Sequence, residues 1–588
     1  MTLKHWRLGV VQKMASSKPG LFAREATGLV REIGFSLGVI IILTHVIGLG
    51  WQKRAFQFTG PSPMPTDWMP LGLPAIFWAF LVCGLIVLVT GYAAGYVAAA
   101  MPRSGGGYVT ISRIIHPSIG YMSGWLMFLA EAFSYGLIGV AVFEGIEIFF
   151  GIAMSPTVVD FGVAGRFLGG LVIVWIFAIV ALLGTKMYGR LLQVLFYIPA
   201  AITIIFFAMW IGGALNSSVT ATGVQNVMGA SPGQFMAIAQ STGMTAAPVG
   251  FFDAFSVALG GAFWAYMGWY ATTFLAGEVK EANKKLPKVL LVAGLLIMAV
   301  YLLASSLSAI AAMNVPLDAA GNTYITDANG HQWSFFQAYA WLSYPPSGAK
   351  AAVEAGRAAI PNFQKAWSTG IASIIANGMG ISWLPILIAI GAVLWVANDI
   401  PPFLLVASRT FFAMSFDRMM PEKFSYVSER WHAPVWAILI TALFAIPACM
   451  AEADFPAGAA SYLAFAGVVG TDIFDAFFLT MFCISCMLLP LERKEIYDRA
   501  AVKHSIGAVV TLGFVATLGA SFCLYIFIKE SPWIFSFFTS GAKFEDIISA
   551  IGFFGCILAG ILLYIGFMYR NTTKGVDMRT LYISIPPE

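Results

Sequence analysis

The residues Val46-Ile47-Gly48-Leu49-Gly50 interrupt the first long apolar stretch of the chain, which begins at Ile33. Two glycines this close together weaken a helix, and loose backbone at membrane depth is tolerated only where it is buried in protein or lines a cavity. Small residues also let transmembrane helices pack closely, which is the plainer explanation of the pair. The stretch therefore predicts either a broken membrane helix beside a cavity or a close helix contact.

The composition of the whole chain is that of a membrane protein. Of its 588 residues, 59% are hydrophobic and only 11% are charged, too few for the surface of a soluble globule. The apolar residues form long continuous runs near the roughly 20 residues that cross a bilayer as a helix, not the alternating segments of a barrel. We expect twelve transmembrane helices, at 33–58, 73–100, 119–150, 167–184, 189–213, 258–277, 288–313, 381–410, 434–451, 459–490, 504–528 and 546–569.

The basic residues indicate the orientation of the chain in the membrane. With the N-terminus in the cytoplasm, most of the 33 Lys and Arg residues fall on the cytoplasmic side, as the positive-inside rule requires. The first 31 residues are basic but lack the compact apolar core and cleavage site of a signal peptide. We expect a multi-pass protein of the cell membrane, in contact with the lipid bilayer, with both termini in the cytoplasm. The net charge of +4 follows from this topology, so we expect no nucleic-acid partner.

The chain lacks the short motifs of common catalytic sites. It has no P-loop, no HExxH sequence and no GxSxG nucleophile elbow. Its six cysteines lie in or beside predicted spans, where Cys483 and Cys486 have the spacing of two small packing residues on one helix face. We therefore expect no enzyme activity, no cofactor and no dedicated metal site, although the sequence is compatible with a bound sodium ion.

The sixth apolar stretch carries a flaw that matches the first. Residues 258–277 contain Gly260, Gly261 and Gly268 among large aromatic side chains. Flawed helices at corresponding positions of two halves indicate a binding site between inverted repeats. The two flaws lie five spans apart, so the second half enters the membrane from the opposite side. The expected domains are a basic tail 1–32, repeats 33–213 and 258–490, extracellular loops 214–257 and 314–380, and two additional helices with a tail in 491–588.

Three motifs occupy predicted loops on the cytoplasmic side. They are Pro102-Arg103-Ser104-Gly105-Gly106-Gly107-Tyr108 with Ser112-Arg113, then Gly277-Glu278-Val279-Lys280, then Ser408-Arg409 with Asp417-Arg418-Met419-Met420-Pro421. Together they resemble the amino acid, polyamine and organocation superfamily, in particular its amino acid permeases, over residues 33–493. The resemblance implies an all-α polytopic membrane protein with about twelve helices, in which a leucine-transporter-type pair of inverted five-helix repeats is followed by two extra helices.

The resemblance also implies where the substrate binds. The broken part of the first helix would hold the substrate carboxylate, and the broken part of the sixth would receive the amine and line the side-chain pocket. Two departures from the superfamily pattern are Leu49, where a small residue is usual, and the lack of a lysine within the fifth span. The second departure means that the mode of ion coupling is not carried over. The implied substrate-binding residues are Val46, Ile47, Gly48, Leu49 and Gly50, then Trp264, Ala265, Tyr266, Gly268 and Trp269.

Several titratable side chains lie within predicted spans that contain almost no Lys or Arg. Glu131, Asp399, Asp472 and Asp475 are the acids, and His45 lies one turn before the glycines of the first span. A buried carboxylate without a cationic partner holds a proton or meets a mobile cation. These five residues are therefore the candidates for coupling transport to an ion. The alternatives are that some of the acids are simply hydrated in a vestibule and that His45 makes a neutral hydrogen bond.

Lys53 and Arg54 follow the first break closely, within the predicted outer half of the membrane. They either mark the outer interface or face a wet vestibule, where Glu144 or Glu147 would pair with them. We expect the vestibule.

The sequence thus predicts a secondary active transporter that moves an amino acid or related amine by alternating access and is coupled to an ion. A polyamine or organic-cation carrier is the alternative that the unpaired acids favour. A channel or a sensor on the same scaffold is the alternative from another class. The expected partners are a small-molecule substrate, an amino acid or amine, and a coupling proton or sodium ion. The sequence leaves open the substrate, the coupling ion, the direction of flux and the oligomeric state.

Overall fold

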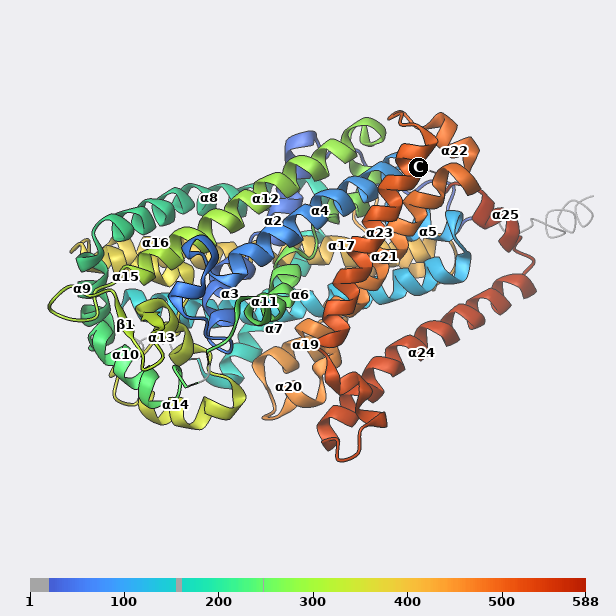
Figure 1. The fold of residues 1–588 in the computed structure, drawn as a ribbon. Helices are drawn as coiled ribbons and strands as arrows, with labels where there is room; N and C mark the ends of the chain where they lie inside the picture. Colours follow the sequence, from blue (N-terminus) through green and yellow to red (C-terminus); the bar gives the residue numbers. More distant parts are fainter. Residues whose placement is uncertain (1–20, 155–160, 247, 588) are drawn as a thin grey trace, which may run out of the picture.

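The computed structural model of the chain describes residues 21–154, 161–246 and 248–587. Within these ranges the chain is mostly helical (Figure 1), and 11 helices are long and apolar enough to cross a membrane. The chain is an all-α polytopic membrane protein, as its composition predicts. The spans are α2 with α3 (Phe35–Val46, Leu49–Thr59), α4 (Ala75–Ala100), α6 (Pro117–Ala153), α7 (Gly162–Ala181), α8 (Thr185–Leu215), α12 (Ala282–Met313), α16 with α17 (Leu384–Ala397, Ile400–Phe416), α18 with α19 (Val435–Phe444, Ile446–Ala453), α21 (Val468–Glu492), α23 (Ile506–Lys529) and α24 (Phe544–Thr573).

The sixth predicted span differs from the expectation of one helix over 258–277. Its helix α11 (Phe251–Tyr266) has 16 residues, fewer than the roughly 20 that cross a bilayer. The helix ends because Met267 is extended, with ψ 143°, and Gly268 has φ +91°, a conformation that favours glycine. The chain continues in the 3-10 turns η3 (Ala271–Phe274) and η4 (Ala276–Glu278).

Short elements gather at the two ends of the helix bundle (Figure 1). We call the end with residues 216–250 and 314–378 the loop end, and the end with residues 103–116, 274–281 and 417–434 the signature end. The loop end holds α9 (Ser217–Met228), α10 (Pro232–Ser241), strands β1 (Tyr324–Thr326) and β2 (Gln332–Ser334), α13 (Phe335–Ser343), α14 (Lys350–Arg357) and α15 (Ser368–Gly378). The signature end holds α5 (Gly107–Ile114), α22 (Lys494–Arg499) and α25 (Met578–Ile583). The remaining elements are α20 (Ala459–Tyr462) and the turns η1 (Thr66–Trp68), η2 (Pro70–Gly72), η5 (Ser347–Ala349), η6 (Glu422–Ser425), η7 (Ala464–Ala466) and η8 (Pro532–Phe538). Strands β1 and β2 pair antiparallel, with Ile325 opposite Trp333.

Burial separates the helices into a centre and a periphery. The most apolar window of α6 is 89% buried and that of α2 with α3 is 83% buried, whereas the windows of α7 and α24 are only 17% and 22% buried. Helix α24 runs along the outside of the bundle (Figure 1) and exposes Leu558, Leu562 and Ile565. Exposed apolar side chains on peripheral helices are expected where lipid is the solvent. The helices that carry the first break and Glu131 therefore lie in the protein centre.

The three motif loops meet at the signature end through buried ion pairs. The Arg409 guanidinium donates to both oxygens of Glu278, at 2.9 and 3.2 Å, and the Arg113 guanidinium donates to both oxygens of Asp417, at 2.5 and 2.8 Å. The Tyr108 hydroxyl also donates to Asp417, at 2.9 Å. Two-pronged Arg–carboxylate contacts fix orientation as well as distance. The motif residues thus hold the loops together at this end of the bundle.

Replacing Glu278 by Gln is expected to lower the free energy of unfolding by about 3–5 kcal/mol, because it takes the carboxylate partner from a buried arginine. The matched control is Glu281→Gln in the same loop, whose partner Lys285 lies at 3.2 Å in an exposed pair. Such exposed pairs contribute about 0–1 kcal/mol. Thermal unfolding of the detergent-purified variants measures both effects. Equal shifts of the unfolding temperature would show that the buried pair stabilises the protein no more than the exposed pair.

Candidate substrate-binding site

The first membrane helix breaks at the glycines that the sequence singled out. Helix α2 ends at Val46, Ile47 and Gly48 leave helical geometry, and α3 begins at Leu49. The Gln52 side-chain amide ties the start of α3 to α16, because it donates to Gly48 O at 3.0 Å and to Ala392 O at 3.2 Å. The prediction of a broken helix is therefore confirmed here, as it is after Tyr266 in the second half.

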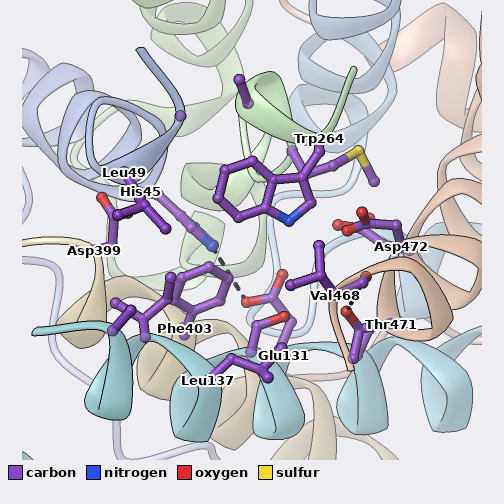
Figure 2. Close-up of a pocket in the computed structure, with 18 of the residues that line it drawn as sticks. His45, Leu49, Glu131, Leu137, Trp264, Asp399, Phe403, Val468, Thr471 and Asp472 are labelled. Atoms are coloured by element: carbon purple, nitrogen blue, oxygen red, sulfur yellow. Dashed lines mark hydrogen bonds and ion pairs between the residues drawn. The ribbon is translucent and has the colours of Figure 1, made fainter. Parts of the chain in front are cut away.

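Both breaks face one pocket in the centre of the bundle (Figure 2). The pocket has a volume of about 50 Å³. It is closed from several sides by helices that are far apart in sequence. Its lining consists of His45, Val46, Leu49 and Gly50 at the first break, Trp264, Ala265 and Met267 at the second, Ala130, Glu131, Ser134, Leu137, Ile138 and Ala141 from α6, Asp399 and Phe403 at the start of α17, Glu452 from α19, and Val468, Thr471, Asp472 and Asp475 from α21.

All five coupling candidates line this pocket, together with half of the implied substrate-binding residues. The other implied substrate-binding residues do not line the pocket; they are Ile47, Gly48, Tyr266, Gly268 and Trp269. The Tyr266 hydroxyl points away to donate to Phe80 O at 3.0 Å, and Trp269 packs on Gly91 of α4. Gly268 lies against the His45 ring, since a Cβ built on Gly268 would come within 2.6 Å of it.

The two breaks touch each other directly. A Cβ built on Gly50 would lie 2.6 Å from the Cβ and 2.9 Å from the Cα of Ala265, so only glycine fits at this contact. Tyr301 of α12 ties the same two segments together, because its hydroxyl lies 2.5 Å from Val46 O and 2.6 Å from Ala265 O. These carbonyls belong to the C-terminal ends of α2 and α11, where helix carbonyls lack helical partners. The close packing holds both broken ends in place.

The charges at the pocket are predominantly acidic. Among the described lining residues, five are Asp or Glu and none is Lys or Arg. His45 Nε2 and Glu131 Oε2 lie 3.4 Å apart, in contact but without hydrogen-bond geometry, and both side chains are almost fully buried. Figure 2 shows the His45 ring pointing at Glu131, while Phe403 packs edge-on against the ring at 4.3 Å. The Tyr270 hydroxyl donates a hydrogen bond to the Asp475 carboxyl group.

One acid lies against the broken helix. A Cβ on Gly48, the residue before α3, would lie 1.8 Å from Asp399 Oδ2, so the carboxyl group occupies the space where a side chain would begin. A side chain from the α16–α17 junction therefore covers the amide end of α3.

The two basic residues after the break face polar and aromatic partners. Lys53 Nζ lies 3.3 Å from Glu144 Oε1, which confirms the predicted pairing, and Glu147 instead pairs with Arg166 at 2.5 Å. The Arg54 guanidinium stacks on the Trp264 ring at 3.8 Å, close enough for a cation–π contact. Arg54 thus covers a pocket residue from the loop-end side.

Sequence reasoning missed several residues of the site. Glu452 lies one residue beyond the predicted end of its span, 434–451, so it was not among the intramembrane acids. Tyr301 has no spacing signal, because a single tyrosine in an apolar run looks like any core residue. The apolar lining from α6, including Leu137 and Ile138, could have been found only from the face that α6 shares with Glu131.

Comparison with known proteins agrees with this architecture. Part of the chain is similar to the serine/threonine exchanger SteT of Bacillus subtilis (strain 168), with 24% identity over an alignment of 289 residues. The similar part spans 47% of this chain and about half of that relative, 54% of its length. The model of the amino acid permease family matches residues 70–576, well over half of the chain. The chain therefore belongs to the amino acid permease family.

Proposed function

We propose that the chain is a secondary active transporter that moves a small amino acid across the cell membrane by alternating access. The observation that carries the proposal is that both broken helices face one central pocket. At this pocket the amide end of α3 suits a carboxylate, and the carbonyl ends of α2 and α11 suit an ammonium group. Both termini are in the cytoplasm in this proposal, and the transporter carries out no covalent chemistry.

The pocket favours a small side chain with a hydroxyl group. Its volume is about 50 Å³, and Ser134 and Thr471 add hydroxyl groups to an otherwise apolar wall of Leu137, Ile138 and Trp264. The similarity to a serine/threonine exchanger points in the same direction. We propose serine or threonine as the first substrates to test.

In this proposal, residues 33–213 and 258–490 are inverted repeats that rock against each other. The signature end is cytoplasmic and is closed by the Arg409–Glu278 and Arg113–Asp417 pairs. The inward-open state would part these loops. Lys53 and Arg54 then line the outer vestibule, as proposed from the sequence.

We further propose that transport is coupled to protons through the pocket acids. Glu131 and His45 are the main pair, because they touch each other beside the first break. Asp399, Asp472 and Asp475 line the same cavity without a Lys or Arg among the described residues of its wall. The surplus of carboxyl groups also supports a second candidate, a carrier of polyamines or other organic cations.

The proposal is tested by counterflow with the purified protein in liposomes. Vesicles loaded with unlabelled L-serine should accumulate external labelled L-serine transiently, and the signal should saturate and be reduced by L-threonine. A channel would show no counterflow, and a sensor would bind without flux. Inhibition by putrescine but not by serine or threonine would favour the cation carrier and reject the amino acid.

A further inference from the structure

The amide end of α3 is already covered by a carboxyl group that belongs to the chain itself. Asp399 Oδ2 lies where a Cβ on Gly48 would stand, only 1.8 Å from that position. Gly48 is the residue before α3 and has φ −134° and ψ −111°, so no side chain of its own competes for the position. In Figure 2, Asp399 lies beside Leu49 on the side of the pocket opposite Asp472.

Asp399 is buried but incompletely satisfied. Its side chain is 5% exposed, and within the described part of the chain its Oδ1 has no hydrogen-bond partner and no ion pair joins it to a Lys or Arg. It lies at the junction of α16 and α17, ahead of Ile400-Pro401-Pro402. A proline lacks the amide N–H that would close the helix at this point, so the junction is not held by a continuous helix ladder. The carboxylate therefore has a favourable contact with α3 and no strong second anchor.

Two carboxylates cannot share this place. The freed amides of one helix end attract an anion within the first turn. Two carboxyl groups a few ångströms apart in a buried site disfavour each other's ionised form, and Asp399 already fills the space beside Gly48. A substrate carboxylate could reach the amides of Leu49 and Gly50 only after Asp399 has left them.

We propose that Asp399 is an internal competitor of the substrate, which caps the amide end of α3 in the empty site and is displaced by the carboxylate of the incoming amino acid. That the displacing molecule is an amino acid rests on the proposed function. That the vacated site binds a carboxylate does not. Displacement lowers the affinity for amino acids and leaves binding of an amine without a carboxylate unopposed. Asp399 is thus a specificity-determining residue that sets the balance between zwitterions and amines.

The test compares L-serine with ethanolamine, which is serine without its carboxyl group. Dissociation constants for both are measured by calorimetry on the purified wild type, Asp399→Ala and Asp472→Asn. In Asp399→Ala we expect serine to bind about tenfold more tightly, with no gain for ethanolamine. Asp472→Asn is the matched control. Loss of any acidic group makes the pocket less negative, and this alone favours a zwitterion over a cation. If the dissociation constants shifted equally in both variants, the effect of Asp399 would be only that of one acidic group among several in the pocket. That result would overturn the proposal.

A second measurement needs no substrate. The vacated amide end of Asp399→Ala should bind acetate, which would then raise the unfolding temperature of this variant by mass action. The wild type and Asp472→Asn should not respond beyond a chloride control. Absence of acetate stabilisation in a folded Asp399→Ala variant would overturn the competitor role, whatever the substrate is. Absence of serine binding and counterflow in the wild type would instead reject the proposed function alone.

Discussion

Replacing Gly50 by valine is expected to weaken substrate binding by about 10- to 100-fold while the protein stays folded in the membrane. The first added carbon would lie 2.6 Å from Ala265 Cβ and 2.9 Å from its Cα, and valine adds two further methyl groups. The two backbones cannot part freely, because the Tyr301 hydroxyl ties Val46 O to Ala265 O. Overpacking of this kind costs about 1–3 kcal/mol. If that cost falls on the binding-competent arrangement of the breaks, the affinity falls by about 10- to 100-fold.

Calorimetry or scintillation proximity with labelled serine measures this loss. The control is Gly555→Val on the peripheral helix α24, where an added Cβ meets nothing within 4 Å among the described residues. Both variants should elute as folded protein from size-exclusion chromatography, and the control should bind as the wild type does. Unchanged affinity in a folded Gly50→Val variant would contradict the assignment of the breaks to the binding site.

Replacing Glu131 by Gln is expected to uncouple transport from the proton gradient. Glu131 is 2% exposed, lines the pocket and touches His45, so its charge state depends on what enters the cavity. A buried carboxylate without a basic partner holds a proton or a mobile cation, whereas glutamine keeps the shape and can do neither. Proton-driven accumulation of serine should therefore fall by about tenfold or more, while exchange of internal for external serine persists.

The measurement is uptake into vesicles under an imposed pH gradient, with and without sodium. Glu147→Gln serves as the control because Glu147 lies on the same helix but pairs with Arg166 away from the pocket. The control should accumulate serine as the wild type does. Uptake that requires sodium alone, or a pH response that survives Glu131→Gln, would show that the proton assignment is wrong.

The fold was predictable to the extent that its signals are local. Eleven of the twelve expected spans appear as helices long enough to cross a membrane in the described residues. The sixth does not, because Gly268 adopts φ +91° and the preceding Met267 is extended. The glycine pair of the first span, which could have been a packing contact, proves to be both a break and a contact, since Gly50 packs on Ala265.

Many of the residues at the site were predictable, but the contacts that they make were not. All five coupling candidates line the pocket, because an acid within an apolar span must find a cavity or a partner. The roles of Tyr266 and Trp269 were less predictable, since an aromatic side chain beside a break can point into the pocket or away from it. Tyr266 turns to Phe80 O, and the packing of α4 makes that choice.

The sequence by itself determined the membrane class, the positions where the helices are weakened and the family motifs, because hydrophobicity, glycine content and short spacings act over a few residues. Only the tertiary structure decided what meets at the breaks. Asp399 lies against Gly48, and Tyr301 joins α2 to α11, although both side chains are hundreds of residues away from the first break in the sequence. Such contacts depend on how whole helices pack against one another, and that packing reflects the shape of every side chain between them.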